Sequence, residues 1–351
     1  MHEALTGLTR FWMDQDCLIV PAADLPLTSA VLHPECFLRL LGPQPRRAAL
    51  VQPVRRPLDG RHGLHSYRLA KHLQFSVHLK PSPDNLLELY RQSLDALGFD
   101  LDHHDLRFGE RRWRIPALGA YGFGWNVQLD GVTVTRVTYV QSAAGIETSP
   151  VSVQLSYGLE RVVIARTGVP SAFDIEWGGD GLDYGRLRHR EEEELSTHAF
   201  DVADTDFVRS QIVGYIDEAS RGLESGLLRL SYESAVRCLF LVDLLEARGG
   251  LAVGERAAWM ASIESVVKDV ATILERTWSP EPSKAASDDQ AAEVKAAEPA
   301  AEPPAEPSTE SSTEPSTESP AEPPAEPPAE PKPAAKPRRR RRRKRKAASD
   351  D

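Results

Sequence analysis

Hydrophobic and polar positions divide the chain into three parts with different patterns. Within residues 1–185, several segments alternate apolar and polar residues, as β-strands with one buried face do. After residue 191, apolar residues recur at three- and four-residue spacing in long segments, which is typical of amphipathic helices. Beyond residue 280 neither pattern continues. The pattern therefore predicts an α+β fold, in which an antiparallel sheet with helices precedes a helical module.

The individual elements follow from the same patterns and from turn residues. Strands are predicted at residues 16–20, 48–54 and 72–80, and through most of 105–157, where Asp130-Gly131 forms a hairpin turn. Helices are predicted at 4–15, at 33–42 with Gly42 at its end, at 81–100, and from 158 to 167. Three long helices are predicted at 206–226, 231–250 and 254–278.

The last seventy residues have a composition that does not support folding. Ala, Pro, Glu, Ser and Thr dominate, Glu recurs at every fourth position from Glu298 to Glu330, and a run of Arg and Lys follows at 338–346. Such a segment has almost no branched apolar or aromatic groups to offset the entropy of ordering. We expect residues 281–337 to be a disordered linker and residues 338–351 an Arg/Lys-rich tail.

Charge limits the possible partners of the folded part. The formal charge of the chain is −10; residues 281–351 hold 13 Lys and Arg and 15 Asp and Glu, which leaves 29 against 37 for residues 1–280. A body of charge −8 is a poor nucleic-acid binder by bulk electrostatics, so RNA contact requires a local patch, a partner or the basic tail. The tail is equally consistent with a charge-balancing or solubilising role.

Cysteine usage and apolar runs indicate the compartment. Cys17, Cys36 and Cys238 are odd in number and lack metal-ligand spacing, as expected in a reducing cytosol. The first residues lack the pattern of a signal peptide, and no apolar run approaches the ~20 residues that span a bilayer. We therefore expect a cytoplasmic protein without a membrane segment.

Positive charge is concentrated in the turn-rich segment 54–77, between two predicted strands. The segment holds Arg55, Arg56, Arg61 and Arg68, and a planar guanidinium binds phosphate oxygens bidentately. A second arginine, at a strand-to-helix junction in the sequence Gly-Leu-Glu-Arg (158–161), could hold the other end of a triphosphate, and Phe75 offers a face to a base. A solvated surface loop with ion pairs would show the same local pattern.

The order of these and other motifs resembles a known family. The matching residues are Trp12, Gln15, Cys17 and Ile19; HP..FLR.LGP.P from His33 to Pro45; VQP.RRP.DGR.G from Val51 to Gly63; Arg68-Leu69; QF.V.LKPSPDN..ELY..SL.ALG.D from Gln74 to Asp100; HD.RF.E..W..P.LGA.G.GW from His104 to Trp125; and YGLER from Tyr157 to Arg161. Most of residues 8–280 thereby resemble the α subunit of the bacterial heterotetrameric glycyl-tRNA synthetase, a class II aminoacyl-tRNA synthetase.

The resemblance implies a fold and an activity. It implies a class II synthetase-type catalytic domain at 1–185 and a helical C-terminal module at 186–280. It also implies ATP- and Mg²⁺-dependent activation of glycine to an aminoacyl adenylate, and transfer to tRNA with a separate β subunit. The segment around Arg39 resembles the family's dimer interface, so a homodimer is expected.

The resemblance also implies roles for individual residues. Arg55 or Arg56 would hold the α-phosphate of ATP, and Arg161 the far end of the triphosphate. Phe75 would stack on adenine, and Glu147 would bind Mg²⁺ or the amino group. The complete expected sets are Arg55, Arg68, Gln74, Phe75, Glu160 and Arg161 for ATP, and Ser76, Tyr121, Trp125, Asn126 and Glu147 for the amino-acid pocket, with Arg55, Arg56 and Arg161 as the catalytic residues.

The sequence departs from the family pattern near the expected amino-acid pocket. The departures are Pro26 and Thr28–Val31 in place of a Glu and a Gly-Ala-Gly-Thr run, Leu64–Tyr67 in place of Glu-Asn-Pro-Asn, Ser76 for Gln, Tyr121 for Trp, Asn126 for Glu, QSAAG (141–145) for Gln-Gln-Val-Gly-Gly, and Val153-Gln154 for Gly-Glu. Drift within a glycyl enzyme explains them, and so does a paralogue that activates another amino acid or uses a non-tRNA acceptor. A non-catalytic RNA-binding relative is a third interpretation, which the presence of the nucleotide-site residues disfavours.

Overall fold

The computed structural model describes residues 1–59, 61–179 and 181–278. The helices are α1 (His2–Asp14), α2 (Pro34–Phe37), α3 (Leu86–Asp95), α4 (Leu159–Thr167), α5 (Tyr184–Thr197), α6 (Thr205–Glu224), α7 (Leu228–Ala247) and α8 (Val253–Trp278), with short helical turns at η1 (Ala30–Leu32), η2 (Leu101–His103), η3 (Pro116–Leu118), η4 (Ala172–Asp174) and η5 (His198–Val202). The strands are β1 (Leu18–Ile19), β2 (Arg46–Arg55), β3 (Lys71–Lys80), β4 (Leu106–Ile115), β5 (Ala120–Leu129), β6 (Val132–Ala143) and β7 (Ile146–Gly158).

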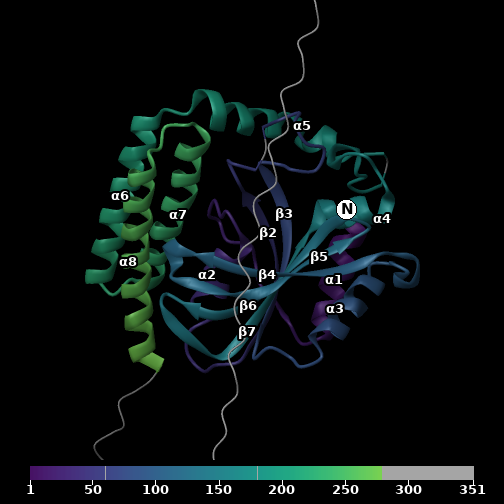
Figure 1. The fold of residues 1–351 in the computed structure, drawn as a ribbon, viewed down its shortest axis with the longest axis horizontal. Helices are drawn as coiled ribbons and strands as arrows, with labels where there is room; N and C mark the ends of the chain where they lie inside the picture. Colours follow the sequence, from purple (N-terminus) through teal and green to yellow (C-terminus); the bar gives the residue numbers. More distant parts are fainter. Residues whose placement is uncertain (60, 180, 279–351) are drawn as a thin grey trace, which may run out of the picture. The chain divides into compact units, whose positions relative to one another are not determined.

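The strands form one sheet (Figure 1), and their order in it is β1-β2-β3-β7-β6-β5-β4. The short β1 runs parallel to β2, and every other neighbouring pair is antiparallel. Asp130 and Gly131 connect β5 and β6 with φ angles of 50° and 82°. Positive φ at both central residues is what a tight two-residue hairpin requires, which is why the Asp-Gly pair predicted this turn.

One face of the sheet is covered by α1, α3 and α4. Phe75 of β3 and Tyr157 of β7 lie in a buried cluster with Trp12 of α1, Leu94 of α3 and residues of α4. In addition, the rings of Tyr90 and Tyr157 stack with centroids 5.7 Å apart. The alternate residues of these strands point to the other face, which these helices leave uncovered.

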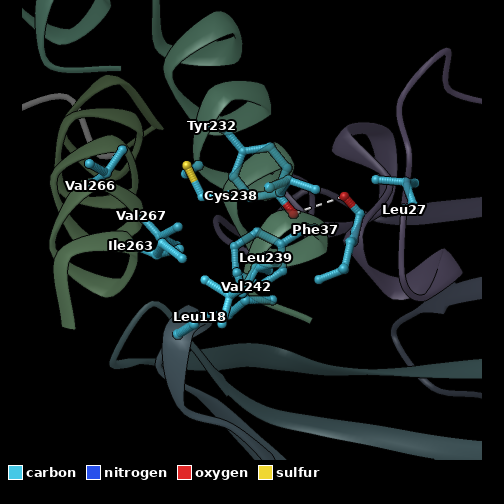
Figure 2. Close-up of a cluster of buried hydrophobic side chains, with 14 of the residues drawn as sticks. Leu27, Phe37, Leu118, Tyr232, Cys238, Leu239, Val242, Ile263, Val266 and Val267 are labelled. Carbon is cyan, nitrogen blue, oxygen red and sulfur yellow. Dashed lines mark hydrogen bonds between the residues drawn. The ribbon is translucent and has the colours of Figure 1, made fainter. Parts of the chain in front are cut away.

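A second apolar cluster joins the C-terminal helices to the rest of the molecule. Figure 2 shows Tyr232 and Val242 of α7 and Val267 of α8 around Leu118 of η3 and Phe37 of α2. The ring of Tyr232 stacks on Phe37 at 5.1 Å, and its hydroxyl donates a 2.9 Å hydrogen bond to the carbonyl of Leu32. Helices α6–α8 therefore share a core with the N-terminal segment.

The helix predicted at 33–42 is wrong in length, because α2 ends at Phe37. The reason is a buried cation. The ammonium of Lys80, 1% exposed, donates to the carbonyls of Leu40 and Gly42. The carbonyls of Leu40 and Gly42 turn toward this ammonium, and the N–H groups of Arg39 and Leu40 donate to the carbonyls of Cys36 and Phe37 in tighter i→i+3 turns, so the α-helix does not continue.

The α+β fold class, with an antiparallel sheet and a helical C-terminal part, is confirmed. The boundary between two domains near residue 185 stays a prediction. The expected linker at 281–337 and basic tail at 338–351 lie outside the described residues. Within the described part of the chain, no helix is both long and apolar enough to cross a bilayer.

Gly42 provides a stability test of the contact between the α2 segment and α8. Its φ is +73°, and an added Cβ would lie 2.6 Å from Cε3 of Trp278, whereas Gly168, with φ +70°, has nothing within 4 Å. We expect Gly168→Ala to lower the free energy of unfolding by about 1–2 kcal/mol through backbone strain alone. Gly42→Ala should lose about 1–3 kcal/mol more, because the ring must move. Urea denaturation of both variants measures the difference, and equal losses would contradict this packing.

Candidate active site

Polar side chains gather on the face of the sheet that α1, α3 and α4 leave uncovered. Gln74 of β3, Ser156 and Gln154 of β7, and Arg136 and Thr138 of β6 lie on this face in register. Two open cavities meet over these residues, and both are lined by Arg56, Gln74, Arg136 and Ser156. We call them the α4 cavity and the β4 cavity after the element that borders each.

The α4 cavity has arginines from two separate elements. Its lining residues are Arg56, Asp59, Tyr67, Leu69, His72, Gln74, Thr133, Val134, Thr135, Arg136, Ser156, Gly158, Glu160 and Arg161. Arg56 follows the end of β2, and Arg161 lies in the first turn of α4. Gly158, the residue that precedes this helix, also lines the cavity, so the helix begins at the cavity wall.

Both arginines are positioned by neighbouring groups. Nε of Arg56 donates to the carbonyl of Thr28 at 2.8 Å, and its Nη1 donates to Oδ2 of Asp59 at 3.1 Å. The guanidinium of Arg161 lies 5.8 Å from the centroid of the Tyr67 ring, within reach of a cation–π contact. Fixed guanidinium groups can bind an anion without first losing conformational freedom.

The site is strongly cationic. Burial, and then the positive charges of Arg56, Arg111 and Arg161, lower the pKa of Arg136 to about 10. Burial and the charges of Arg56 and Arg161 lower the pKa of His72 to about 3, so this imidazole is neutral at physiological pH. A group of cations that repel one another gains stability when a polyanion such as a triphosphate binds among them.

Glu160 connects the cavity wall to the elements behind it. Its Oε1 accepts hydrogen bonds from the backbone N–H of Leu73 at 2.8 Å and from the hydroxyl of Tyr184 at 2.9 Å. The side chain is 2% exposed, and burial raises its pKa to about 7. Glu160 therefore holds β3, α4 and α5 together at the cavity.

The structure brings together part of the expected nucleotide set. Arg56, Gln74, Glu160 and Arg161 line the α4 cavity. Arg68 is exposed beside it and close enough to Arg161 to contribute to the lowered pKa of that guanidinium, whose main cause is burial. These positions agree with the sequence-based expectation, although a ligand contact for each stays a prediction.

Phe75 and Arg55 are not brought to this cavity. Phe75 is 1% exposed and packs against Tyr157 in the helix-covered core, because it is one residue from Gln74 and so points to the opposite face. The structure therefore does not bring Phe75 to the cavity face, where it was expected to stack on adenine. Arg55 lines another, apolar cavity with Leu195 and Phe240 of the helical part, and Arg56 contributes to that cavity too. Of the two hairpin arginines, Arg56 is the one that lines the α4 cavity.

The expected amino-acid pocket is also divided by the sheet. The Ser76 hydroxyl accepts a 2.6 Å hydrogen bond from Nε2 of Gln154, and Asn126 pairs with Arg136, so both lie on the cavity face. Trp125 packs into the helix-covered cluster on the opposite face. Tyr121 and Glu147 are exposed, and each pairs with Ser142 near the far end of β6. Neither of these two lines the cavities.

Several residues that line the cavities were given no role by the sequence reasoning, among them Asp59, Tyr67, His72, Arg111 and Arg136. A period-two reading of β3 would have found His72, because it is two residues from Gln74 and shares its face. The positions of Arg111 and Arg136 depend on the pairing of β4, β5 and β6, which local patterns do not specify.

The carboxylates present suit a metal ion that arrives with phosphate rather than a protein-made metal cage. In residues 1–59, 61–179 and 181–278, no three His, Cys, Asp or Glu side chains gather as metal ligands. Asp59 and Glu160 line the α4 cavity beside the arginines, whereas Glu147 does not. Mg²⁺ is commonly held by one or two carboxylates together with substrate phosphates, and Asp59 and Glu160 are the carboxylates that line this cavity.

The raised pKa of Glu160 predicts a pH-dependent stability. Because its folded-state pKa of about 7 lies above the ordinary 4.5, its contribution to stability is complete below pH ~4.5 and is lost as the pH rises through ~7. Glu160→Gln keeps the acceptor but cannot ionise. We expect its free energy of unfolding, relative to wild type, to rise by about 1–3 kcal/mol between pH 5 and pH 8. Urea denaturation across this range measures it, with exposed Glu193→Gln as the control, and a flat difference would contradict the assignment.

Comparisons with known proteins give the family. The family model described as glycyl-tRNA synthetase alpha subunit matches residues 1–277. A curated glycine–tRNA ligase alpha subunit from Coprothermobacter proteolyticus is 40% identical over 270 residues, which is 77% of this chain and 92% of that protein. Two solved structures of pyrrolysyl-tRNA synthetase from Desulfitobacterium hafniense align over 52% of this chain and 73% and 76% of theirs, with TM-scores of 0.37 and 0.36 and identities of 14% and 13%.

The family match confirms the resemblance seen in the sequence motifs, and with it the expectation of an enzyme, a ligase of the glycine–tRNA ligase type. It spans the sheet, the arginine-lined cavities and helices α6–α8. The chain therefore belongs to the glycyl-tRNA synthetase alpha subunit family.

Proposed function

We propose that this chain activates an amino acid with ATP to form an aminoacyl adenylate, the first step of aminoacylation. Family membership supports aminoacylation chemistry. The observation that carries the adenylation step is the pair Arg56 and Arg161, which come from separate elements and line one cavity. A cavity with guanidinium groups on two sides suits a triphosphate better than a single phosphate.

The reaction requires positioning more than proton transfer. A carboxylate oxygen of the amino acid forms a bond to the α-phosphorus, the bond from this phosphorus to its bridging oxygen breaks, and pyrophosphate leaves with the electron pair. Arg56 binds the α-phosphate, where negative charge develops. Arg161 binds the far phosphates and orients the leaving group. Prearranged cations stabilise the charge of the transition state without moving during the reaction.

The remaining lining residues supply the other parts of the nucleotide site. Tyr67 and His72 are aromatic side chains that line the α4 cavity, and they would contact the base or ribose in the role first expected of Phe75. The low pKa of His72 keeps its ring neutral beside the arginines. Asp59 and Glu160 would hold Mg²⁺ together with phosphate oxygens, and bound Mg²⁺ would neutralise part of the triphosphate charge.

Transfer of the activated amino acid to tRNA is the second part of the proposal. The relative from Coprothermobacter proteolyticus is named as the alpha subunit of a glycine–tRNA ligase, which supports a separate β subunit and tRNA as partners of this chain. A homodimer through the Arg39 segment, a cytoplasmic location, and RNA contact by the basic run at 338–346 belong to the same proposal. A non-tRNA acceptor is the alternative, and assay of the chain with and without a β partner separates the two.

Loss of Arg161 should impair catalysis without unfolding the protein. We expect Arg161→Ala to lower the rate of amino-acid-dependent ATP–pyrophosphate exchange by about 10²-fold or more, because a phosphate contact made in the transition state is lost. Circular dichroism and thermal denaturation serve as controls for the fold. Unchanged exchange in a folded variant would show that the nucleotide site is elsewhere.

The adjacent hairpin arginines provide a matched pair of variants. Arg56 lines the α4 cavity, whereas Arg55 does not. We expect Arg56→Gln to lower the exchange rate by about 10²-fold or more, because the α-phosphate contact is lost. Arg55→Gln should stay within a few-fold of wild type. The reverse order of these two rates would overturn the assignment of Arg56.

A further inference from the structure

The β4 cavity lies where the substrate of the proposed adenylation would bind. It shares Arg56, Gln74, Arg136 and Ser156 with the α4 cavity, so a ligand in it is next to the arginine assigned to the α-phosphate. The inference below rests on the proposed function, because it concerns the substrate that the ATP site would activate.

The lining of the β4 cavity is rich in cations. Its residues are Ser29, Val31, Arg56, Arg111, Arg112, Trp113, Arg114, Ile115, Gln74, Arg136, Thr138, Gln154 and Ser156. Five of them are arginines, and among the described residues no Asp or Glu lines this cavity. An ammonium group bound here would meet repulsion without a carboxylate partner.

Arg111 and Arg136 are available to a ligand. In the described part of the chain, neither guanidinium has a carboxylate oxygen within 4.0 Å, in contrast to Arg107 on the same strand, which pairs with Asp105 at 2.8 Å. Burial lowers the pKa of Arg111, and burial together with neighbouring arginines lowers that of Arg136. Arg111 is half-buried and Arg136 is exposed to the cavity. Among the described residues, neither guanidinium has an anionic partner to offset the repulsion of the neighbouring arginines until an anion binds.

The amide groups in the cavity are already partly occupied. Oε1 of Gln74 accepts from the backbone N–H of Ala30 at 3.1 Å, and Nε2 of Gln154 donates to the Ser76 hydroxyl at 2.6 Å. The side-chain oxygen of Gln74 therefore has little more than one free lone pair with which to accept a hydrogen bond from a cationic group. The arginines, by contrast, offer several unused N–H donors, which match carboxylate oxygens.

We infer that the β4 cavity binds the second anionic group of the substrate, which is a small dicarboxylate. One carboxylate lies near Arg56 and attacks the α-phosphate, and Arg111 and Arg136 bind the other. Acidic amino acids and amine-free dicarboxylic acids share this chemistry. Glycine lacks the second carboxylate and brings an ammonium group, so it binds weakly.

Binding of defined ligands to the full chain tests the inference. Isothermal titration calorimetry compares aspartate, glutamate, malonate, succinate and glycine, each with and without a non-hydrolysable ATP analogue. We expect at least one dicarboxylate to bind about tenfold or more tightly than glycine. Arg111→Gln should weaken that ligand about tenfold or more, because a charged partner is lost, and should leave the affinity for the ATP analogue unchanged. Arg107→Gln, on the same strand, is the matched control and should bind like wild type.

The same ligands are then assayed by ATP–pyrophosphate exchange. Tighter binding of aspartate or glutamate than of malonate and succinate would identify the dicarboxylate substrate as an amino acid. Equal binding of the two kinds of ligand would identify it as an amine-free acid. Both outcomes support the inference. Glycine binding as tightly as every dicarboxylate, or unchanged dicarboxylate binding in Arg111→Gln, overturns it. Pyrophosphate exchange with glycine and not with dicarboxylates would support the proposed adenylation and contradict the inference of a dicarboxylate substrate. Dicarboxylate binding without pyrophosphate exchange for any ligand would support an anion-binding site in the β4 cavity and contradict the proposed adenylation.

Discussion

The two-residue alternation of an antiparallel sheet is the constraint on which the rest of this structure depends. In β3, Phe75 and Val77 are buried under the helices, whereas His72 and Gln74 line the cavities. Because each strand is in fixed register with its neighbours, the same division extends across β7, β6 and β5. A shift of one residue in any strand would exchange the two faces. The apolar core thus determines which polar residues reach the site.

This division lets the sheet hold together cations that repel one another. Arg136 lies on a central strand and Arg111 on the edge strand β4, and Arg56 and Arg161 reach the same space from the ends of other elements. The ladders fix the backbone of Arg111 and Arg136, and hydrogen bonds to the Thr28 carbonyl and to Asp59 hold the guanidinium of Arg56, so the positive charges stay near one another. Asp59 balances part of the charge through Arg56. Apolar burial on one face of the sheet therefore maintains an electrostatically unfavourable arrangement on the other, as is common where a protein binds an anion.

The sequence predicted the elements well where local chemistry determines them. The Asp130-Gly131 hairpin, the strands around the arginine loop and the three long helices all appear near their expected bounds. The predicted helix at 33–42 is shorter in the structure, where α2 ends at Phe37. In the segment that follows, Lys80, forty residues away in sequence, binds the carbonyl of Leu40. No local pattern carries that information.

The site was predictable to the extent that motifs lie at element ends. Arg56 and Arg161 could be identified because a hairpin and a strand-to-helix junction are visible in sequence. The motif gave the identity of Phe75 but not the face of the sheet to which it points, and the structure places its ring in the helix-covered core. Arg111 and Arg136 were missed because strand pairing, which is non-local, brings them beside Arg56.

The contrast between the acidic body and its cationic cavities limits what can bind. Residues 1–280 carry a formal charge of −8, so a nucleic acid approaching the surface at large meets repulsion over an extended area. A small anion inside the cavities meets mainly the nearest charges, because partly buried charges are screened less by salt and solvent than surface ones. The same molecule can therefore attract small anions to its cavities while offering little bulk attraction to RNA. Productive tRNA binding then requires positive charge from outside the acidic body, from a partner or from the basic run at 338–346.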